Sequence, residues 1–416
     1  METIKKHIRN FLKRHHGLRI LVRKHYGNFK ESRYVKRTRN LELDDKLVLF
    51  ETFMGRQYGC NPKAIYERML RDPRFDDYRL VWTLIDPGKA DQFEALDRAE
   101  VVKMKSKEYF DVCAQAKYIV TNSNLDNRIA KREGQVFLQT WHGTPLKRLR
   151  CDIRAEKGNA NNTLEEIKMR NDIDVVRYDY FVSPSAFCTD KFISAFNLKE
   201  LGKEDILIET GYPRNDLLFS FDDAYAAKVR EEIGIPEGKK VILYAPTFRD
   251  NKHDGSGYVY DTHLDFDRLR DRLGDEYAVL FRAHYFVANQ FDFGKYEGFV
   301  YDVSGHDDIT PLYTITDLLI TDYSSVFFDF ANLGRPMLFY MYDLDEYADD
   351  IRGFYMDIGE LPGPIVRDEE KLADEIIALT EKPFERDEKY IRFNEKYNYL
   401  DDENASRRVI DILFGE

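Results

Sequence analysis

A histidine within the segment QTWHGTPLK, residues 139–147, is the first candidate for chemistry. His142 follows the apolar run 136–138, so the pattern places it where a strand ends and a loop opens. An imidazole there can take a proton from an attacking hydroxyl, because its ordinary pKa lies near neutrality. Gly143 permits a close backbone approach or a positive φ, and Thr144-Pro145 can begin a helix. A tight turn whose histidine only satisfies backbone groups fits the same pattern.

An arginine and a second histidine stand two residues apart in the segment FRAH, residues 281–284, directly after the apolar run 277–280. Because side chains alternate along an extended chain, Arg282 and His284 should point the same way. Arg282 can meet phosphate oxygens with its fork of donors, and His284 can act as a donor or an acid. A loop histidine bonded only to its surroundings is the alternative interpretation.

The segment TDYSSVFFDF, residues 321–330, has the pattern of an anion site. The run 318–320 predicts a buried strand, and residues 326–333 predict a helix. Ser324 and Ser325 then lie in the first turn of that helix, beside unpaired backbone N–H groups and the positive end of the helix dipole. Helix capping by Asp322 or Ser324 is the alternative. Because capping explains one such residue more easily than the whole cluster, we favour a phosphate site.

Two further segments combine arginine with turn residues. GYPRND, residues 211–216, closes the first half of the chain, and its Arg214 is a candidate phosphate contact. YAPTFRD, residues 244–250, follows a predicted strand, and we expect Thr247 and Arg249 to face a cleft. A purely structural turn fits this second segment equally well.

The elements that must position these residues alternate between short apolar runs and amphipathic stretches, which indicates parallel sheets covered on both faces. Helices are expected in the gaps, for example at 62–70 and 186–196. We predict an α/β fold of two Rossmann-like domains facing across a cleft, with a linker near 214–225 and ligands beyond the carboxyl ends of the strands. The predicted strands are 47–50, 78–84, 118–120, 136–139, 180–182 and 206–209 in the first series, and 241–244, 279–282, 298–301, 318–321 and 336–339 in the second.

Composition excludes several classes of protein. The chain has 416 residues, and 43% of them are hydrophobic, which is enough for two packed domains rather than a disordered or fibrous chain. Its four cysteines are scattered without a CxxC pair, so we expect neither a disulfide framework nor a zinc site. No GxxxxGK[ST] loop, GxGxxG fingerprint or close acidic cluster is present, so no metal or tightly bound cofactor is expected. With no long apolar run and no signal peptide, a cytoplasmic protein is expected.

The first 40 residues differ in charge from the rest of the chain. They contain thirteen Lys or Arg and two acidic residues, a net charge of +11, so the other residues carry −23 of the total of −12. Apolar residues at 4, 8, 11, 12, 18, 21 and 22 fall close to helical spacing, and a basic amphipathic helix of this kind lies well at an anionic membrane surface. A solvated helix packed on the acidic body and a nucleic-acid arm are alternatives. The nucleic-acid reading ranks last because no recognition pattern follows. Because Gly17 interrupts the pattern, two short helices fit this segment as well as one continuous helix.

Taken together, these segments resemble the CDP-glycerol:poly(glycerol phosphate) glycerophosphotransferase family, whose members build or prime wall teichoic acid and whose relatives make capsular polymers. The resemblance rests on QTWHGTPLK, GYPRND, YAPTFR, RAH and TDYSSVFFDF, which occur in the family's order, and it extends to GCNPKAIYE at 59–67. It covers most of residues 45–385. WHGTP with TDYSS at this separation is a much stronger signal than either motif alone.

The resemblance implies a GT-B fold with the nucleotide in the C-terminal domain. It implies an arm at 1–40 on the cytoplasmic face of the membrane, an acceptor domain at 41–215, a CDP-donor domain at 225–385, and a C-terminal helix at 386–416 that can cross back to the first domain. CDP-glycerol would be the donor and a lipid-linked saccharide the acceptor. The predicted site residues are His142 and His284 for catalysis; Arg282, Thr321, Asp322, Ser324, Ser325, Arg249 and Thr247 for the donor phosphates; and Trp141, Gly143, Thr144 and Arg214 at the acceptor or cleft.

One departure from the family concerns the second histidine, which is often followed by proline but here by Tyr285. The assignment of His284 is therefore less direct than that of His142. A GT-B glycosyltransferase using a nucleotide sugar shares the fold and the phosphate cradle and is the alternative enzyme, and a membrane-bound scaffold on an inactive transferase fold is the non-enzymatic one. The sequence does not distinguish a primase from a polymerase, or a glycerol donor from a ribitol donor. The acceptor and the oligomeric state also stay open.

Overall fold

The computed structural model describes residues 15–153, 163–247, 264–283, 293–345 and 353–415, and it divides into two compact units. The first unit comprises Met1–His142, Arg148–Ser183 and Thr189–Glu209, and the second comprises Gly143–Lys147, Pro184–Cys188 and Thr210–Glu416. After the two short segments 143–147 and 184–188, the chain passes to its second unit for the last time at 209–210, before the predicted linker at 214–225. That stretch is no linker, because Arg214 and Asn215 are buried within the second unit.

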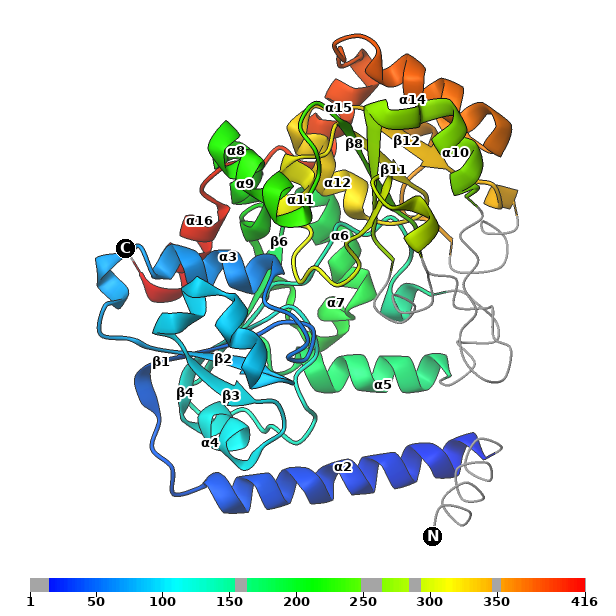
Figure 1. Cartoon of the computed structure of the whole chain (residues 1–416). Helices are drawn as coiled ribbons and strands as arrows, with labels where there is room; N and C mark the ends of the chain where they lie inside the picture. The colour runs from blue at the N-terminus through cyan, green and yellow to red at the C-terminus, as the bar shows by residue number, and fades with distance from the viewer. Residues whose placement is uncertain (1–14, 154–162, 248–263, 284–292, 346–352, 416) are drawn as a thin grey trace. The chain divides into compact units, whose positions relative to one another are not determined.

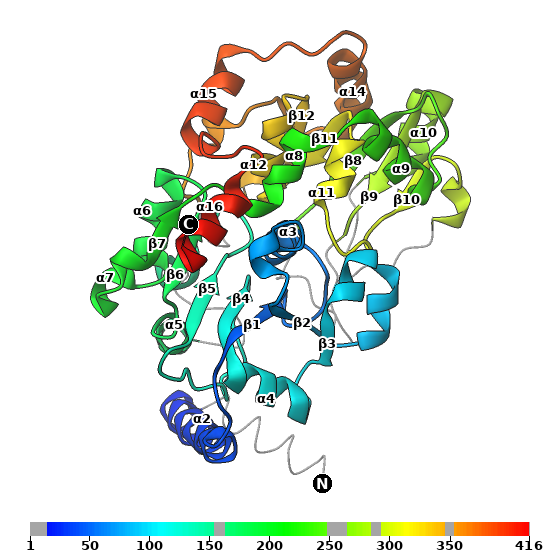
Figure 2. The same cartoon turned by 90° about the vertical axis from the view of Figure 1, so that its left-hand side faces the viewer.

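The first unit is built on a seven-stranded parallel sheet in the order β3-β2-β1-β4-β5-β6-β7 (Figure 2). The inner strand β1 is completely buried from 47 to 50, as expected of a parallel strand covered on both faces. The strands are β1 Asp44–Glu51, β2 Arg79–Leu84, β3 Glu100–Lys103, β4 Ala116–Thr121, β5 Val136–Gln139, β6 Tyr180–Ser183 and β7 Leu207–Glu209. The helices before Thr210 are α2 His16–Thr38, α3 Cys60–Met69, α4 Lys107–Gln115, α5 Leu164–Val175, α6 Ala186–Ala195 and α7 Leu198–Leu201.

The second unit is built on a six-stranded parallel sheet in the order β10-β9-β8-β11-β12-β13. Its strands are β8 Lys240–Ala245, β9 Tyr277–Phe281, β10 Val300–Asp302, β11 Leu318–Thr321, β12 Met337–Tyr340 and β13 Ile365–Val366. Its helices are α8 Asp216–Ser220, α9 Asp223–Ile233, α10 Phe266–Leu273, α11 Thr310–Thr314, α12 Val326–Phe330, α14 Leu372–Thr380, α15 Glu388–Tyr397 and α16 Ala405–Phe414.

Most predicted strands are confirmed, and β5 and β11 have the predicted bounds. The predictions missed β3 and β13, which are four and two residues long. The helix predicted at 326–333 is an α-helix to Phe330 and a 3-10 turn from Ala331 to Leu333. The predicted helix start at Thr144-Pro145 is wrong, since Lys147 instead forms an isolated bridge with Phe354. Residues 386–416 contain two helices, α15 and α16, and both belong to the second unit.

The described part of the basic N-terminal segment is one continuous helix, α2, which passes through Gly17 without a break. It packs against the first unit, and Figure 1 shows it beside α4 and α5. Both Arg19 and Arg23 donate to the buried carboxylate of Glu166 in α5, with a closest Arg19 distance of 2.5 Å. Arg37 pairs with Asp111 in α4 at 2.8 Å. One side of the helix is therefore packed on the unit's own acidic residues, which was one of the alternatives for this segment.

A buried carboxyl ends strand β1 of the first sheet. The side chain of Glu51 is wholly buried, and one of its oxygens accepts a hydrogen bond of 2.8 Å from the hydroxyl of Tyr109. Burial raises the pKa of Glu51 to about 7, although the Tyr109 bond opposes the shift. Because the folded carboxyl holds its proton more tightly than the unfolded one, its contribution to stability is present below the unfolded pKa and is lost as pH rises through about 7.

We expect Glu51→Gln to raise the free energy of unfolding at about pH 8 by up to about 3 kcal/mol, and to change it little at about pH 5. Glutamine keeps an acceptor for the Tyr109 hydroxyl but cannot ionise, so it removes only the cost of burying the charge. Urea unfolding of both proteins across this pH range measures the difference. A difference that does not vary with pH would contradict the prediction.

Candidate active site

His142 lies in the first unit, three residues beyond the end of β5, where the sequence pattern predicted it. Its Nδ1 is 2.7 Å from the backbone carbonyl of Asn122, which follows β4. Because a carbonyl only accepts hydrogen bonds, Nδ1 must carry the proton in this contact, and Nε2 is then the basic nitrogen. The ring lies against the indole of Trp141, with centroids 4.2 Å apart, and against the ring of Phe53, with centroids 5.4 Å apart. The tautomer and orientation of the imidazole are thus both determined by neighbouring groups.

The turn that presents His142 has its strained residue at Trp141. A positive φ was one of the two possibilities predicted for Gly143, but in this turn it is Trp141 that takes the left-handed conformation, with φ +52°. Gly143 is required for a different reason, the close approach that was the other predicted possibility. A Cβ at Gly143 would lie 2.7 Å from Oγ of Ser325 and 3.9 Å from Nη2 of Arg214, both in the second unit, as Gly143 is. The glycine after the candidate base and the serine pair of TDYSS are therefore neighbours.

The TDYSS segment divides its polar residues between two uses. Thr321 Oγ1 donates to the carbonyl of Ala245 at 2.7 Å, and Asp322 Oδ1 accepts from the backbone N–H groups of Thr247 at 2.8 Å and Tyr323 at 2.6 Å. These two buried side chains tie the carboxyl ends of β8 and β11 together. Ser324 and Ser325 are instead half-buried. Within TDYSS the serine pair is therefore the least buried part, and α12, which follows it, is only five residues long.

The two arginines of the predicted site that the structure describes bind protein groups. Arg282 donates from Nη1 to the carbonyl of Val303 and from Nη2 to that of His306, each at 2.9 Å. Burial lowers the pKa of its guanidinium. Arg214 forms a buried ion pair of 2.6 Å with Asp329. In this structure both side chains therefore stabilise the second unit. The N–H groups that were expected to bind phosphate instead bond to a carboxylate, in the case of Arg214, and to backbone carbonyls, in the case of Arg282.

The remaining predicted residues are distributed as follows. Thr144 is buried, and its hydroxyl is a hydrogen-bond partner of the Cys188 thiol, so it belongs to the packing of the second unit. Thr247 bonds to Asp322 through its backbone N–H. His284 and Arg249 lie outside the described residues. The structure thus brings Gly143 and Ser325 together and assigns packing or tethering contacts to Thr144, Arg214, Arg282, Thr321 and Asp322.

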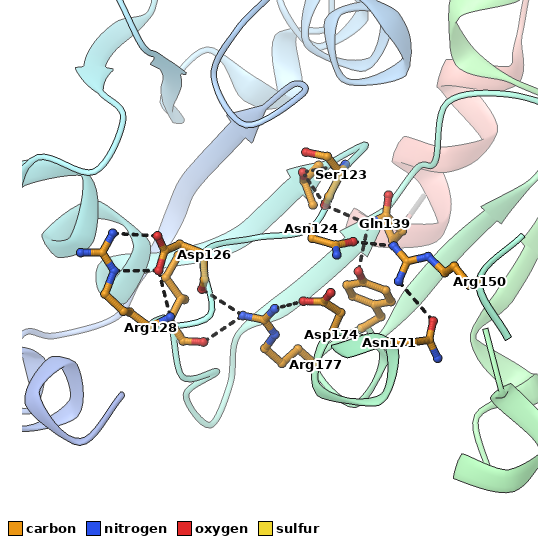
Figure 3. A network of polar contacts seen from close by, with 12 residues as sticks. Ser123, Asn124, Asp126, Arg128, Gln139, Arg150, Asn171, Asp174 and Arg177 are labelled. Atoms are coloured by element: carbon orange, nitrogen blue, oxygen red, sulfur yellow. Dashed lines mark hydrogen bonds and ion pairs between the residues drawn. The ribbon is translucent and has the colours of Figure 1, made fainter. Parts of the chain in front are cut away.

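Sequence reasoning missed a group of polar residues behind Trp141 and His142. Arg150 donates to Asn124 at 2.6 Å and to Asn171 at 3.2 Å, as Figure 3 shows, and its guanidinium lies 5.3 Å from the centre of the Trp141 ring. Gln139, at the end of β5, accepts a hydrogen bond of 2.9 Å from the Trp141 N–H. Of these residues only Gln139 stands in a quoted motif, QTWHGTPLK; Asn124, Arg150 and Asn171 carry no spacing signal, so nothing in the sequence singled them out.

Comparisons with known proteins agree with this architecture. The model of the family described as CDP-Glycerol:Poly(glycerophosphate) glycerophosphotransferase matches residues 33–415. A teichoic acid poly(glycerol phosphate) polymerase of Bacillus spizizenii is 40% identical over 378 residues, covering 90% of this chain and 93% of that protein. A polymerase of the same name from Bacillus subtilis is 41% identical over 372 residues, covering 89% of this chain but only 48% of that protein. The chain thus spans about half the length of this second relative.

Solved structures show the same fold. A structure of the wall teichoic acid polymerase TagF is 35% identical, has a TM-score of 0.83, and is matched over 98% of this chain and 97% of that one. A putative UDP-N-acetylglucosamine 2-epimerase from Listeria monocytogenes, 14% identical with a TM-score of 0.51 over 89% of this chain and 96% of that one, shows the fold alone. Two parallel α/β units of this kind define a protein of the GT-B class. Within that class, the chain belongs to the CDP-Glycerol:Poly(glycerophosphate) glycerophosphotransferase family, and it is a glycerophosphotransferase.

Proposed function

We propose that this enzyme transfers glycerol phosphate from CDP-glycerol to a lipid-linked teichoic acid acceptor at the cytoplasmic face of the membrane, and releases CMP. The family and the names of the relatives support the donor and the polymer. The observation that carries the mechanism is the contact of His142 Nδ1 with the Asn122 carbonyl, because it leaves Nε2 as a proton acceptor of defined orientation.

In the proposed reaction, a hydroxyl oxygen of the acceptor attacks the phosphorus that bears the glycerol. The hydroxyl proton moves to Nε2 of His142 as the new P–O bond forms. The bond from that phosphorus to the bridging oxygen breaks, and CMP leaves with the electron pair. No redox change occurs, so the catalytic work consists of positioning, proton transfer and charge stabilisation.

The donor phosphates are proposed to bind beside Ser324 and Ser325, which are half-buried whereas the other residues of TDYSS are buried. Thr321 and Asp322 serve this site indirectly, by tying the ends of β8 and β11 together. His284 remains the candidate acid for the leaving CMP. Arg282 is assigned to supporting the loop 303–306 through its two carbonyl contacts, in place of the direct phosphate contact that the motif suggested.

The test is CMP release from CDP-glycerol, with and without a lipid-linked disaccharide that already carries one glycerol phosphate. CDP-ribitol and a nucleotide sugar serve as competing donors. Acceptor-dependent release from CDP-glycerol alone is the expected result, and the length of the product distinguishes the addition of one unit from polymerisation. Turnover of the nucleotide sugar without release from CDP-glycerol would overturn the proposal.

The surface of α2 supports peripheral attachment to the membrane. Leu18, Val22, Tyr26 and Phe29 follow the helical repeat along one face and are exposed, Tyr26 to 58% and Phe29 to 57%, and the helix is rich in Lys and Arg. Apolar side chains between cations are suited to the boundary between the headgroups and acyl chains of an anionic membrane. Within the described residues, no helix has both the length and the apolar content needed to cross a bilayer.

We expect the triple variant Leu18→Ser, Val22→Ser and Phe29→Ser to lose most of its binding to vesicles of phosphatidylglycerol and phosphatidylcholine, while turnover of a soluble acceptor is retained. Removing the whole segment is a poorer test, because Arg19 and Tyr34 are buried in the first unit. Phe219→Ser, which changes an apolar residue 42% exposed in the second unit, is the matched control. Sedimentation with vesicles measures binding, and equal binding of the triple variant and wild type would contradict attachment through α2.

A further inference from the structure

We propose that Asn61 is a positioning residue for His142, and that it holds the strained turn at Trp141 in the conformation that presents the imidazole. The inference deepens the proposed function and rests on it to the extent that His142 is the base. It also gives a role to the segment GCNPKAIYE, residues 59–67, which none of the steps above uses.

The turn requires support because its conformation is costly. Trp141 has φ +52°, a region that a residue with a bulky side chain rarely adopts and that costs on the order of 1–3 kcal/mol. The indole is nonetheless closely packed, with its ring centroid 4.9 Å from that of Phe196 and 4.2 Å from that of His142. A relaxed backbone at Trp141 would move the indole and, with it, the ring of His142.

Asn61 is placed to prevent that relaxation. Its Nδ2 donates to the carbonyl of Thr140 at 3.2 Å and to that of Trp141 at 3.1 Å. A carboxamide nitrogen carries two hydrogens, so one side chain can bond both carbonyls of the turn. Gln139 Oε1 accepts from the Trp141 N–H at 2.9 Å, so the backbone of the strained residue is held on both sides. All of these groups belong to the first unit.

Asn61 is itself rigidly held. It is the second residue of α3 and is completely buried. The preceding residue, Cys60, also has a positive φ, +61°, and the following Pro62 restricts the backbone further. A buried donor with this little freedom fixes the positions of the carbonyls that it bonds. The contact pathway therefore runs from Asn61 to the backbone of Trp141, and from the Trp141 indole to the imidazole.

The chain offers a matched control in Gln135. It is a buried carboxamide in the same unit, and its Nε2 also donates to two backbone carbonyls, those of Cys113 at 2.8 Å and Ala116 at 2.7 Å. It directly precedes β5, whereas His142 follows the other end of that strand, and its two bonds reach the end of α4 and the start of β4. Gln135→Ala therefore removes the same chemistry from a buried site without disturbing the turn.

The experiment compares Asn61→Ala, Asn61→Ser and Gln135→Ala in the full-length chain. Misplacement of a catalytic group by about 1 Å can lower a rate about 100-fold, so we expect a fall of this order in kcat for Asn61→Ala, with KM for CDP-glycerol little changed. Asn61→Ser keeps one donor and should retain intermediate activity, and it replaces the alanine variant if that protein does not fold. Gln135→Ala should lower Tm without lowering kcat.

A second measurement does not depend on turnover. In ¹⁵N-histidine-labelled protein, the resonance missing from His142→Gln identifies His142, and the nitrogen chemical shifts report its tautomer. Wild type and Gln135→Ala should show the Nδ1–H form, whereas Asn61→Ala should show a mixture. If no donor is turned over, the proposed function fails and the tautomer still decides the role of Asn61. If Asn61→Ala lowers only Tm and retains the wild-type tautomer, the positioning role is overturned.

Discussion

Replacing His142 with glutamine is expected to lower kcat for acceptor-dependent CMP release by about 10²–10⁴-fold, the usual contribution of a positioned general base. Glutamine has a similar size and can still donate to the Asn122 carbonyl, but it cannot take a proton from the acceptor hydroxyl. The fall should appear in kcat more than in KM, because the interaction lost is made in the transition state. Steady-state kinetics with CDP-glycerol and a saturating acceptor measure both quantities.

The pH dependence adds a second criterion. In wild type, activity should fall on the acid side as the base becomes protonated, and this limb should be absent from the residual activity of His142→Gln. His306→Gln is the control, because no role is assigned to that side chain and the variant keeps the backbone carbonyl that accepts from Arg282. Full activity in His142→Gln would place the base elsewhere. Equal losses in both variants would indicate a general effect on folding.

Replacing Arg214 with methionine is expected to lower the free energy of unfolding by about 3–5 kcal/mol, because it leaves the Asp329 carboxylate buried without its partner. The arginine side chain is 8% exposed and the aspartate 4%, and the two meet at 2.6 Å. Asn215 also donates to Asp329, at 3.2 Å, but a neutral amide does not balance the charge. Urea unfolding of the wild type and the variant measures the loss.

Two further variants test the explanation. Arg214→Met combined with Asp329→Leu should recover much of the loss, because no buried charge is left alone. Arg392→Met breaks the exposed pair with Glu388 in α15, which should cost no more than about 0.5 kcal/mol. If Arg214→Met is as stable as Arg392→Met but raises KM for CDP-glycerol, Arg214 contacts the donor, as its motif suggested, and its pairing with Asp329 is not its main role.

The resemblance and the hydrophobic pattern predicted the fold well for clear physical reasons. Strands buried on both faces appear as continuous apolar runs, so β5 and β11 could be located residue by residue. The polar motifs follow such runs and therefore fall at the carboxyl ends of strands. The prediction failed at β3, where Glu100 and Lys103 interrupt the apolar pattern, and at β13, whose two residues are too few to form a pattern.

The unit boundary shows a second kind of failure. Residues 214–225 contain turn-forming residues and resemble a linker, but Arg214 and Asn215 bond to Asp329, more than 100 positions away in the chain. Asp401, between α15 and α16, accepts from the backbone N–H of Tyr212 at 2.8 Å. Local composition contains no trace of these distant partners, so the sequence predicts a linker where Arg214 and Asn215 are in fact buried within the second unit.

By itself, the sequence determined the class of this protein: two parallel α/β series, a histidine after one strand, a serine pair after another, and a basic amphipathic N-terminal segment. Those features depend on residues close together in the chain, and periodicity and motifs report them directly. Only the tertiary structure decided what each polar side chain does. In that structure Arg282 and Arg214 bond to protein groups, and Thr321 and Asp322 bond to the end of β8 and the residues after it. Asn61 donates to the backbone carbonyl of Trp141. A hydrogen bond depends on which distant groups meet in space, and the order of residues along the chain does not contain that information.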